Sequence, residues 1–343
     1  MTTAVEIDNV SIVFGKNPAK ALPLMDKGLD RSEIQTKTDQ VLGVHDCSLT
    51  VEEGEILVLM GLSGSGKSTL LRAVNGLNPV ARGEVRVSDG GQMVSVTDAT
   101  PQGLRKIRLS RVAMVFQQFG LLPWRTVREN VGLGLELGGM AKPERAKKVD
   151  EQLDLVGLAD WGDRKVGELS GGMQQRVGLA RAFVTDAPIL LMDEPFSALD
   201  PLIRTRLQDE LLDLQQKLQR TIIFVSHDLD EAFKLGNHIA IMEGGRIVQK
   251  GTPKDIFTNP ANDYVADFVA NMNPLGVLTA ADVMEPLDCQ PAQHIDAGAS
   301  VEEAMRSIVD LEMPLAVISG GQPIGQISKA GLIKKLLDAR PDQ

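Results

Sequence analysis

Residues 61–68, GLSGSGKS, combine a glycine-rich loop with a lysine and a serine at the spacing that suits phosphate binding. Backbone N–H groups of such a loop surround phosphate oxygens, and the lysine adds a positive charge. The apolar run EILVLM precedes the loop, and STLLRAVNGL, which can form a helix, continues from it. Because this order places a helix N-terminus against an anion, we expect a nucleotide phosphate here. The simpler alternative is a glycine-rich turn before a core helix.

Polar side chains end three other apolar runs of the sequence. Asp193 and Glu194 close the run ILLM, Gln117 closes RVAMVF, and His227 follows TIIFVS. Adjacent carboxylates at the end of a buried strand cost free energy unless a cation or a reaction uses them. Ligands bind at the carboxyl ends of strands in open α/β sheets, so we expect these side chains near the phosphate loop. The alternatives are solvated strand ends for the acids and the glutamine, and an ordinary surface or core residue for the histidine.

A second glycine motif, LSGGMQQR, begins at Leu169 and leads into a helix-forming stretch. Ser170 can cap this helix, while Gly171 and Gly172 let a ligand approach the backbone. The motif therefore predicts a second anion-binding helix start. Further along, Asp200 stands before a proline and is the expected N-cap of a long amphipathic helix.

The elements that must position these residues alternate between strands and helices. Residues 4–14 alternate as a strand on a sheet edge, and Phe14 at its end could stack on a base, although core packing is the commoner use of such a side chain. Residues 16–40 interrupt the strand pattern with two prolines and a polar, partly helical tract. GEVRVSDG and QMVSVTD predict an antiparallel pair, and residues 119–180 are mostly helical. The order predicts an α/β fold.

Length and charge limit the kind of protein this chain can be. With 343 residues it suits two domains, or one large domain with an appendage. Its formal net charge of -10 and its lack of a basic tract argue against a nucleic-acid binder. No apolar run reaches the roughly 18 residues of a membrane span, and the N-terminus lacks a signal-peptide pattern. We expect a cytoplasmic protein with reduced Cys47 and Cys289, which reaches a membrane only through a partner and does not insert into it.

The ordered set of motifs, and LSGGMQQR above all, resembles the ATP-binding cassette of ABC transporters over residues 4–273. The resemblance implies an ABC-type P-loop NTPase with a RecA-like core, an antiparallel β subdomain and a helical subdomain at about residues 119–187. It also implies ATP and Mg²⁺ as cofactors and ATP hydrolysis as the reaction. We therefore expect residues 1–273 to form the ATP-binding domain and residues 274–343 a separate appendage.

The resemblance also implies a role for each residue of the expected nucleotide site. Lys67 would hold the β and γ phosphates of ATP. Ser68, Asp193 and Gln117 would serve magnesium, directly or through water. Glu194 would be the general base that polarises the attacking water.

Other implied roles concern the base, the γ-phosphate and a second copy of the chain. Phe14 would stack on adenine, and His227 would contact the γ-phosphate. The loop that binds the nucleotide would consist of Gly61, Leu62, Ser63, Gly64, Ser65, Gly66, Lys67, Ser68 and Thr69. Asp200 would organise the opposite protomer, and the residues that close over ATP bound to the other subunit would be Ser170, Gly171 and Gly172. One copy of each motif per chain therefore implies a homodimer with two shared sites.

Three sequence features resemble the ATPases of glycine betaine, proline and choline importers: the segment KNPAKALPLMDKG, the loop form MGLSGSGKSTLLRAVNGL, and Met173 in place of the commoner glutamine. The chain's length and short appendage favour the choline transporter ATPase. The resemblance implies an extracytoplasmic substrate-binding protein, and an integral membrane permease docked at residues 119–130, where Leu121, Leu122 and Trp124 lie. It also implies a place on the cytoplasmic face of the bacterial inner membrane. The alternatives are a soluble ABC-type mechanical ATPase, an importer ATPase for another small solute, and a nucleotide-binding regulator without turnover.

The pattern changes from Thr279 onward. Ser300 and Glu303 form a capping box before an apolar stripe at Val301, Ala304, Met305, Ile308 and Val309. Two short strands and a final helix follow, which resembles one CBS module, a small α+β regulatory unit normally found in pairs. Here pairing would have to occur between chains. In adenosine-binding modules a polar residue near the end of the second strand is followed three positions later by Asp, whereas here Gly331 stands three positions after Ser328. We therefore favour a dimerisation appendage over an adenosine site or an ionic-strength sensor.

Overall fold

The computed structural model describes residues 2–117, 120–270, 273–288 and 293–338. Cys289 and residue 119, the first of the expected permease-docking segment 119–130, lie outside these ranges. The contacts divide the chain into two compact units, Met1–His227 with Ala240–Val248, and Asp228–Ile239 with Gln249–Gln343. The expected boundary at residues 273 and 274 stays a prediction. None of the helices in the described ranges has both the length and the apolar character that crossing a membrane requires.

In the described chain, the larger sheet has six strands in the order β10-β9-β3-β8-β7-β6. Its parallel members are β3 (Ile56–Met60), β8 (Thr221–Val225), β7 (Ile189–Asp193) and β6 (Val112–Val115). All residues of β3, β7 and β8 are buried, as continuous apolar runs predict for strands covered on both faces. The hairpin of β9 (His238–Glu243) and β10 (Arg246–Gly251) turns at two glycines of positive φ, Gly244 and Gly245.

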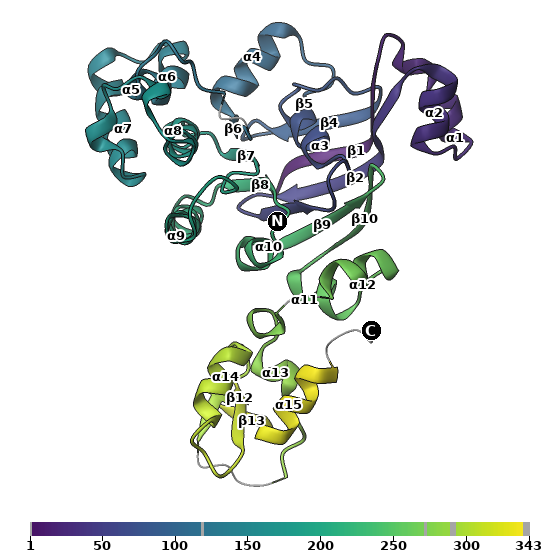
Figure 1. Ribbon diagram of the computed structural model, residues 1–343, viewed down its shortest axis with the longest axis vertical. Coiled ribbons are helices and arrows are strands. Elements are labelled where there is room, and N and C mark those ends of the chain that lie inside the picture. Colours follow the sequence, from purple (N-terminus) through teal and green to yellow (C-terminus); the bar gives the residue numbers. More distant parts are fainter. Residues whose placement is uncertain (1, 118–119, 271–272, 289–292, 339–343) are drawn as a thin grey trace. The chain divides into compact units, whose positions relative to one another are not determined.

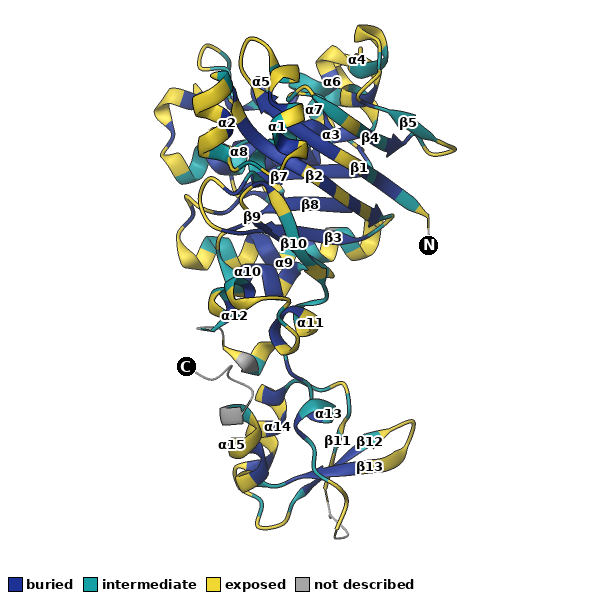
Figure 2. Ribbon diagram, turned by 90° about the vertical axis from the view of Figure 1, so that its right-hand side faces the viewer, coloured by how far each residue is buried: buried dark blue, intermediate teal, exposed yellow. Residues whose placement is uncertain are grey.

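A second, antiparallel sheet has the order β2-β1-β4-β5 over the described residues. It consists of β1 (Thr3–Phe14), β2 (Val41–Glu52), β4 (Arg82–Ser88) and β5 (Met93–Ser95), with β4 and β5 pairing as expected. The prediction of an edge position for residues 4–14 is wrong, because β1 pairs on both sides, with β2 and with β4. Helix α3 (Lys67–Val74) shares one core cluster with both sheets, whose strands are mostly buried in Figure 2.

Residues 16–40, between β1 and β2, fold into a small helical lobe with its own apolar cluster. The lobe contains α1 (Leu22–Asp26) and α2 (Arg31–Thr38), drawn in purple in Figure 1. The buried residues of this cluster are Ala21, Met25 and Ile34 from the lobe, together with Val13 of β1 and Leu42 of β2. The predicted interruption of the strand pattern is therefore an ordered element of the fold.

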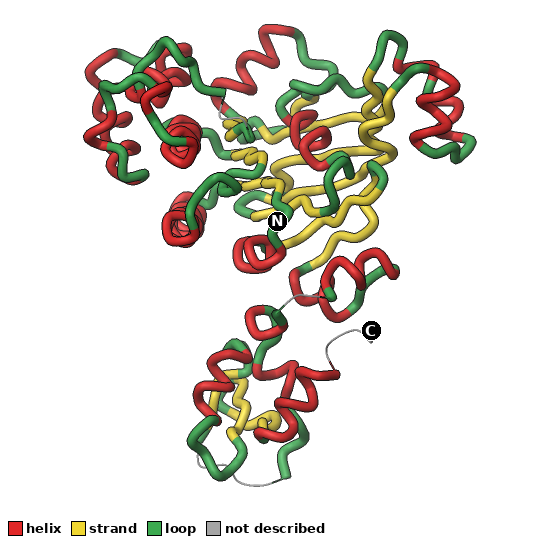
Figure 3. Tube along the Cα trace, in the orientation of Figure 1, coloured by secondary structure: helices red, strands yellow, loops and turns green. Residues whose placement is uncertain are grey.

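The helical region follows β6 and is visible in Figure 3 as a group of helices beside the strands. It contains α5 (Val127–Val131), α6 (Leu133–Leu137), α7 (Lys142–Leu155) and α8 (Gly171–Phe183), and α8 contacts both α5 and α7. Before it comes α4 (Pro101–Ser110), and α9 (Pro201–Leu218) follows β7. In the loop before α5, Leu121 and Leu122 are half-buried, whereas the side chain of Trp124 is 69% exposed.

The second unit contains α10 (Leu229–Leu235), α11 (Pro253–Thr258), α12 (Asp263–Val269) and α13 (Ala280–Val283), followed by a small α+β fold. In the part that is described, β11 (His294–Asp296), β12 (Leu315–Ser319) and β13 (Gln322–Ile327) form one sheet, with α14 (Val301–Ile308) and α15 (Lys329–Asp338) in the same unit.

Helix α14 begins with the capping box that the sequence predicts. Its apolar stripe is narrower than predicted, because Met305 and Val309 are exposed. Near the start of α15, the Ser328 hydroxyl donates to the Glu285 carboxylate at 2.8 Å, and that carboxylate fills the space beside Gly331. Resemblance to a CBS module stays a prediction.

Candidate functional site

The phosphate-loop sequence connects buried β3 to α3, and its glycines have backbone conformations that side chains disfavour. Gly61, Gly64 and Gly66 have φ values of +135°, +80° and +103°. At Gly61 a Cβ atom would lie 2.1 Å from the carbonyl oxygen of Met242. Steric exclusion therefore fixes this loop at the start of α3, where backbone N–H groups are available to an anion.

Lys67 is the cation of this loop. Its Nζ donates to the carbonyl oxygens of Gly61 at 2.7 Å and Leu62 at 2.9 Å. Burial lowers the pKa of Lys67, while the negative charges of Glu194 and Asp193 raise it. The charged ammonium is thus held by neutral carbonyls in a partly desolvated site, an arrangement that an anion would stabilise.

Asp193 ends β7 with no exposed surface and binds two groups of α3. The Ser68 hydroxyl donates to its Oδ1 at 2.6 Å, and Arg72 Nη2 donates to its Oδ2 at 2.7 Å. Arg72 was not predicted from the sequence, although its place four residues after Ser68 puts both on one helix face.

Hydroxyl and carboxylate oxygens are ligands that Mg²⁺ prefers, completed by substrate phosphates and water. Ser68 and Asp193 fit this role. Within the described residues, no three His, Cys, Asp or Glu side chains come close enough together to hold a metal ion on their own. Phosphate oxygens would therefore have to supply further ligands.

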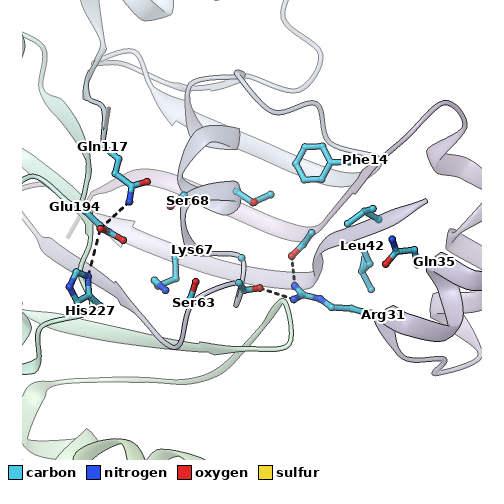
Figure 4. Close-up of a pocket in the computed structure, with 15 residues that line it drawn as sticks. Phe14, Arg31, Gln35, Leu42, Ser63, Lys67, Ser68, Gln117, Glu194 and His227 are labelled. Carbon is cyan, nitrogen blue, oxygen red and sulfur yellow. Dashed lines mark hydrogen bonds and ion pairs between the residues drawn. The ribbon is translucent and has the colours of Figure 1, made fainter. Parts of the chain in front are cut away.

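Glu194 lies between the two other polar side chains that end apolar runs, as Figure 4 shows. Gln117 Nε2 donates to Glu194 Oε2 at 3.1 Å, and His227 Nδ1 lies 3.7 Å from the same oxygen. Glu194 has φ +50°, rare for a residue with a side chain, and its N–H donates to the carbonyl oxygen of Val225 at 3.1 Å. The ends of β6, β7 and β8 thus bring together the three groups, as their sequence positions predict.

A cavity of about 660 Å³ joins these groups to the phosphate loop. Its polar wall includes Lys67, Ser68, Gln117, Glu194 and His227. At its other end lies Phe14, whose ring is 38% exposed. An exposed aromatic ring at the cavity favours stacking on a base over the core-packing alternative. Residues of the loop that also line the cavity are Ser63, Gly64, Gly66 and Thr69.

The second glycine motif does not line this cavity. Ser170 caps α8 by accepting a hydrogen bond from the N–H of Met173 at 3.4 Å, and Asp200 caps α9 by accepting one from Ile203 at 3.1 Å. Gly171 and Gly172 lie in the first turn of α8, with nothing within 4 Å of a Cβ at Gly171. One chain therefore presents these groups away from its own phosphate loop.

Gln175, a buried residue of α8, was also not predicted to belong to the site. Its Nε2 donates to the carbonyl oxygen of Glu194 at 3.2 Å, and its Oε1 accepts from the N–H of Ala198 at 3.1 Å. The helix of the second glycine motif is thereby linked to the segment that carries the carboxylates.

A family model described as "ABC transporter" matches residues 44–197. The chain is 50% identical over 283 residues to the glycine betaine/proline betaine transport system ATP-binding protein ProV of Salmonella typhimurium, covering 82% of this chain and 70% of that protein. It is 42% identical over 332 residues to the trimethylamine N-oxide transport system ATP-binding protein TmoW of Ruegeria pomeroyi, covering 96% of each.

Among solved structures, it is similar to a dimeric post-hydrolysis state of the ATP-binding cassette MJ0796 bound to ADP and Pi. The TM-score is 0.63 at 30% identity, over 73% of this chain and 98% of that chain.

Proposed function

This chain belongs to the ATP-binding subunits of ABC transporters, ATPases that use ATP with Mg²⁺, and we propose that it powers the import of a quaternary amine through a partner membrane permease. The observation that carries the proposal is the cavity in which Lys67, Ser68, Gln117, Glu194 and His227 meet. The names of its relatives supply the transport class.

The cavity supports a division of labour between its residues in ATP hydrolysis. The loop N–H groups and Lys67 bind the phosphates, and Phe14 stacks on the adenine. Ser68 and Asp193 would hold Mg²⁺, which would neutralise charge on the phosphates. Gln117 would face the same region through its contact with Glu194. Glu194 accepts the proton of the attacking water, and His227 contacts the γ-phosphate beside it.

A complete site requires a second copy of the chain. Ser170, Gly171 and Gly172 do not line the cavity of their own chain, and the similar cassette of known structure is a dimer. We propose that these residues close over ATP bound to the partner, with Asp200 organising the opposite protomer. Two ATP molecules then favour the closed dimer, and hydrolysis removes the γ-phosphates that hold it.

An apolar groove supports a permease contact beside this site. It has a volume of about 620 Å³ and lies among α4, β6, α6 and α8. Its apolar lining includes Leu77, Leu109, Met114, Phe116, Leu133 and Leu137. Leu77 and Leu137 are exposed there, and Trp124 is exposed nearby in sequence. Exposed apolar side chains around a groove suit an inserted helix of a partner.

The transported solute is the least constrained part of the proposal. The relatives' names give glycine betaine, proline betaine and trimethylamine N-oxide, which share a fully substituted, positively charged nitrogen. Choline shares this group and is the candidate that the sequence analysis favours. An extracytoplasmic substrate-binding protein delivers the solute, and the ATPase acts at the cytoplasmic face of the bacterial membrane.

Reconstitution of the chain with its membrane and binding subunits tests the proposal. We expect ATP-driven uptake of a labelled quaternary amine, with choline, glycine betaine and proline compared in competition. Uptake of an unrelated solute would contradict the substrate class. ATP hydrolysis that never couples to any membrane subunit would favour a soluble mechanical ATPase.

A further inference from the structure

Helix α2, from the lobe of residues 16–40, contributes to the nucleotide cavity. Arg31 and Gln35 line the cavity together with the phosphate loop and Phe14. Figure 4 shows the Arg31 side chain extending from the lobe toward two oxygen atoms, one in the phosphate loop and one in β2. Arg31 has no part in the phosphate, Mg²⁺ or adenine contacts proposed for the other residues of the cavity.

The guanidinium of Arg31 bridges two backbone segments of the site. Nη1 donates to the carbonyl oxygen of Gly64 in the phosphate loop at 2.7 Å, and Nη2 donates to that of Gly43 at 2.6 Å. Gly43 lies against the Phe14 ring, because a Cβ there would be 2.8 Å from Phe14 Cε2. One side chain therefore connects the phosphate end of the cavity to its aromatic end.

The described hydrogen bonds of the Arg31 guanidinium go to neutral carbonyl oxygens, those of Gly64 and Gly43. Burial lowers the pKa of Arg31, while the nearby Cys47 raises it. Its Nε is buried and has no hydrogen-bond partner. Arginine has five N–H donors and remains charged in proteins, so the group is suited to a further anionic partner. Lys67 Nζ likewise donates to carbonyl oxygens, although the negative charges of Glu194 and Asp193 also act on it.

The lobe holds Arg31 on a rigid element. Arg31 is the first residue of α2, whose start is fixed by a capping box between Asp30 and Glu33. Ile34 on the same helix is fully buried in the apolar cluster of the lobe. A side chain anchored in this way loses little further entropy when a ligand binds, which favours a binding role.

We propose that the lobe of residues 16–40 forms one wall of the ATP site, in which Arg31 is a positioning residue that holds the phosphate loop through Gly64 and adds positive charge against the phosphates. The inference rests on the assignment of this cavity as the ATP site. Arg31 therefore sets the affinity for ATP without taking part in the cleavage of the phosphate bond.

Calorimetric binding of ATP, ADP and AMP to the full chain tests this inference. Arg31→Ala and Arg31→Gln weaken ATP binding by about tenfold or more, as expected for lost charged hydrogen bonds. The loss of affinity decreases from ATP to ADP to AMP, because fewer phosphate groups interact with the positive charge of Arg31. Arg31→Lys restores part of the affinity. In steady-state assays KM for ATP rises while kcat at saturating ATP is unchanged, a split that general destabilisation would not produce.

Two controls separate the possible failures. Lys37→Ala removes an exposed charge from the same helix and should leave binding unchanged. Lys67→Ala should abolish ATP binding if the cavity is the ATP site. Wild-type affinity in Arg31→Gln together with lost binding in Lys67→Ala overturns the role of Arg31. Wild-type affinity in both variants instead overturns the site assignment, and the role of Arg31 with it.

Discussion

Gln175 donates a hydrogen bond from its Nε2 to the backbone carbonyl oxygen of Glu194 at 3.2 Å. The same carboxamide accepts the N–H of Ala198, so one buried side chain fixes both ends of the turn after β7. Glu194 has a left-handed backbone conformation, which persists when its surroundings hold it. The helix that begins at the second glycine motif therefore also supports the carboxylate proposed as the general base.

Replacing Gln175 with leucine should lower kcat for ATP hydrolysis while leaving the affinity for ATP near the wild-type value. The reason is that the variant removes two hydrogen bonds that hold the Glu194 turn and leaves the N–H of Ala198 without its partner, while Ser197 still donates to the Glu194 carbonyl oxygen. The cost is about 1–3 kcal/mol in the free energy of unfolding. ATPase assays and urea unfolding measure both effects, with the exposed Gln102→Leu on α4 as control. An unchanged kcat would show that the turn holds Glu194 without Gln175.

Arg72→Met should destabilise the nucleotide-free protein more than the protein with Mg·ATP. The variant leaves the fully buried Asp193 with Ser68 as its remaining hydrogen-bond donor, which costs about 1–3 kcal/mol. A bound cation would compensate the same carboxylate, so the difference in Tm from the wild type should shrink with Mg·ATP. Thermal unfolding with ATP and EDTA is the control without a bound cation. The Arg72→Lys variant is the control that keeps a positive charge beside Asp193. An equal loss of Tm under both conditions would contradict the shared role of Asp193.

The main features of the site could be predicted from sequence because each lies at the end of an apolar run. Parallel strands carry their polar ends to one edge, so Asp193, Glu194, Gln117 and His227 could be grouped without knowing any contact. The positive φ values of the loop could also be predicted locally, because glycine adopts them without the steric cost of a side chain.

Arg31, Arg72 and Gln175 could not be identified in this way, because they lie within helices and not at the ends of apolar runs, and their partners are distant in sequence. Arg72 and Asp193 are 121 positions apart, and Arg31 and Gly64 are 33 apart. The lobe of residues 16–40 also lacks a hydrophobic period long enough to predict its helices, whose packing depends on contacts with β1 and β2.

Cys47 should make stability fall as the pH rises above about 9. Burial raises the pKa of Cys47 to about 11, against 9.0 for a free thiol. The stabilising effect of the neutral thiol is therefore complete below pH 9 and is lost as the pH passes through 11, a change of up to about 3 kcal/mol. Urea unfolding between pH 8 and 11, in a Cys289→Ala background, should show a steeper loss than in Cys47→Ala. Equal slopes would mean that Cys47 ionises freely in the folded state.

Ser170→Arg should prevent ATP-driven dimer formation while each chain still binds ATP. Ser170 lies outside the cavity of its own chain, so a bulky cation there would act on the face presented to a partner. Because the variant also removes the cap of α8, retained ATP binding by the single chain is the control for local damage. Both forms of residue 170, serine and arginine, are placed in a Glu194→Gln background, in which bound ATP persists. Light scattering then compares the fraction of dimer that each variant forms with ATP. A dimer of unchanged stability would exclude the second glycine motif from the interface.

The role of Glu194 as general base is the centre of this account, and Glu194→Gln tests it directly. Glutamine keeps the shape of the side chain but cannot accept the proton of the attacking water. ATP hydrolysis should fall by a factor of about 10²–10³, while calorimetry should give an unchanged Kd for ATP. A hydrolysis rate equal to that of the wild type would contradict the assignment of Glu194 as the base.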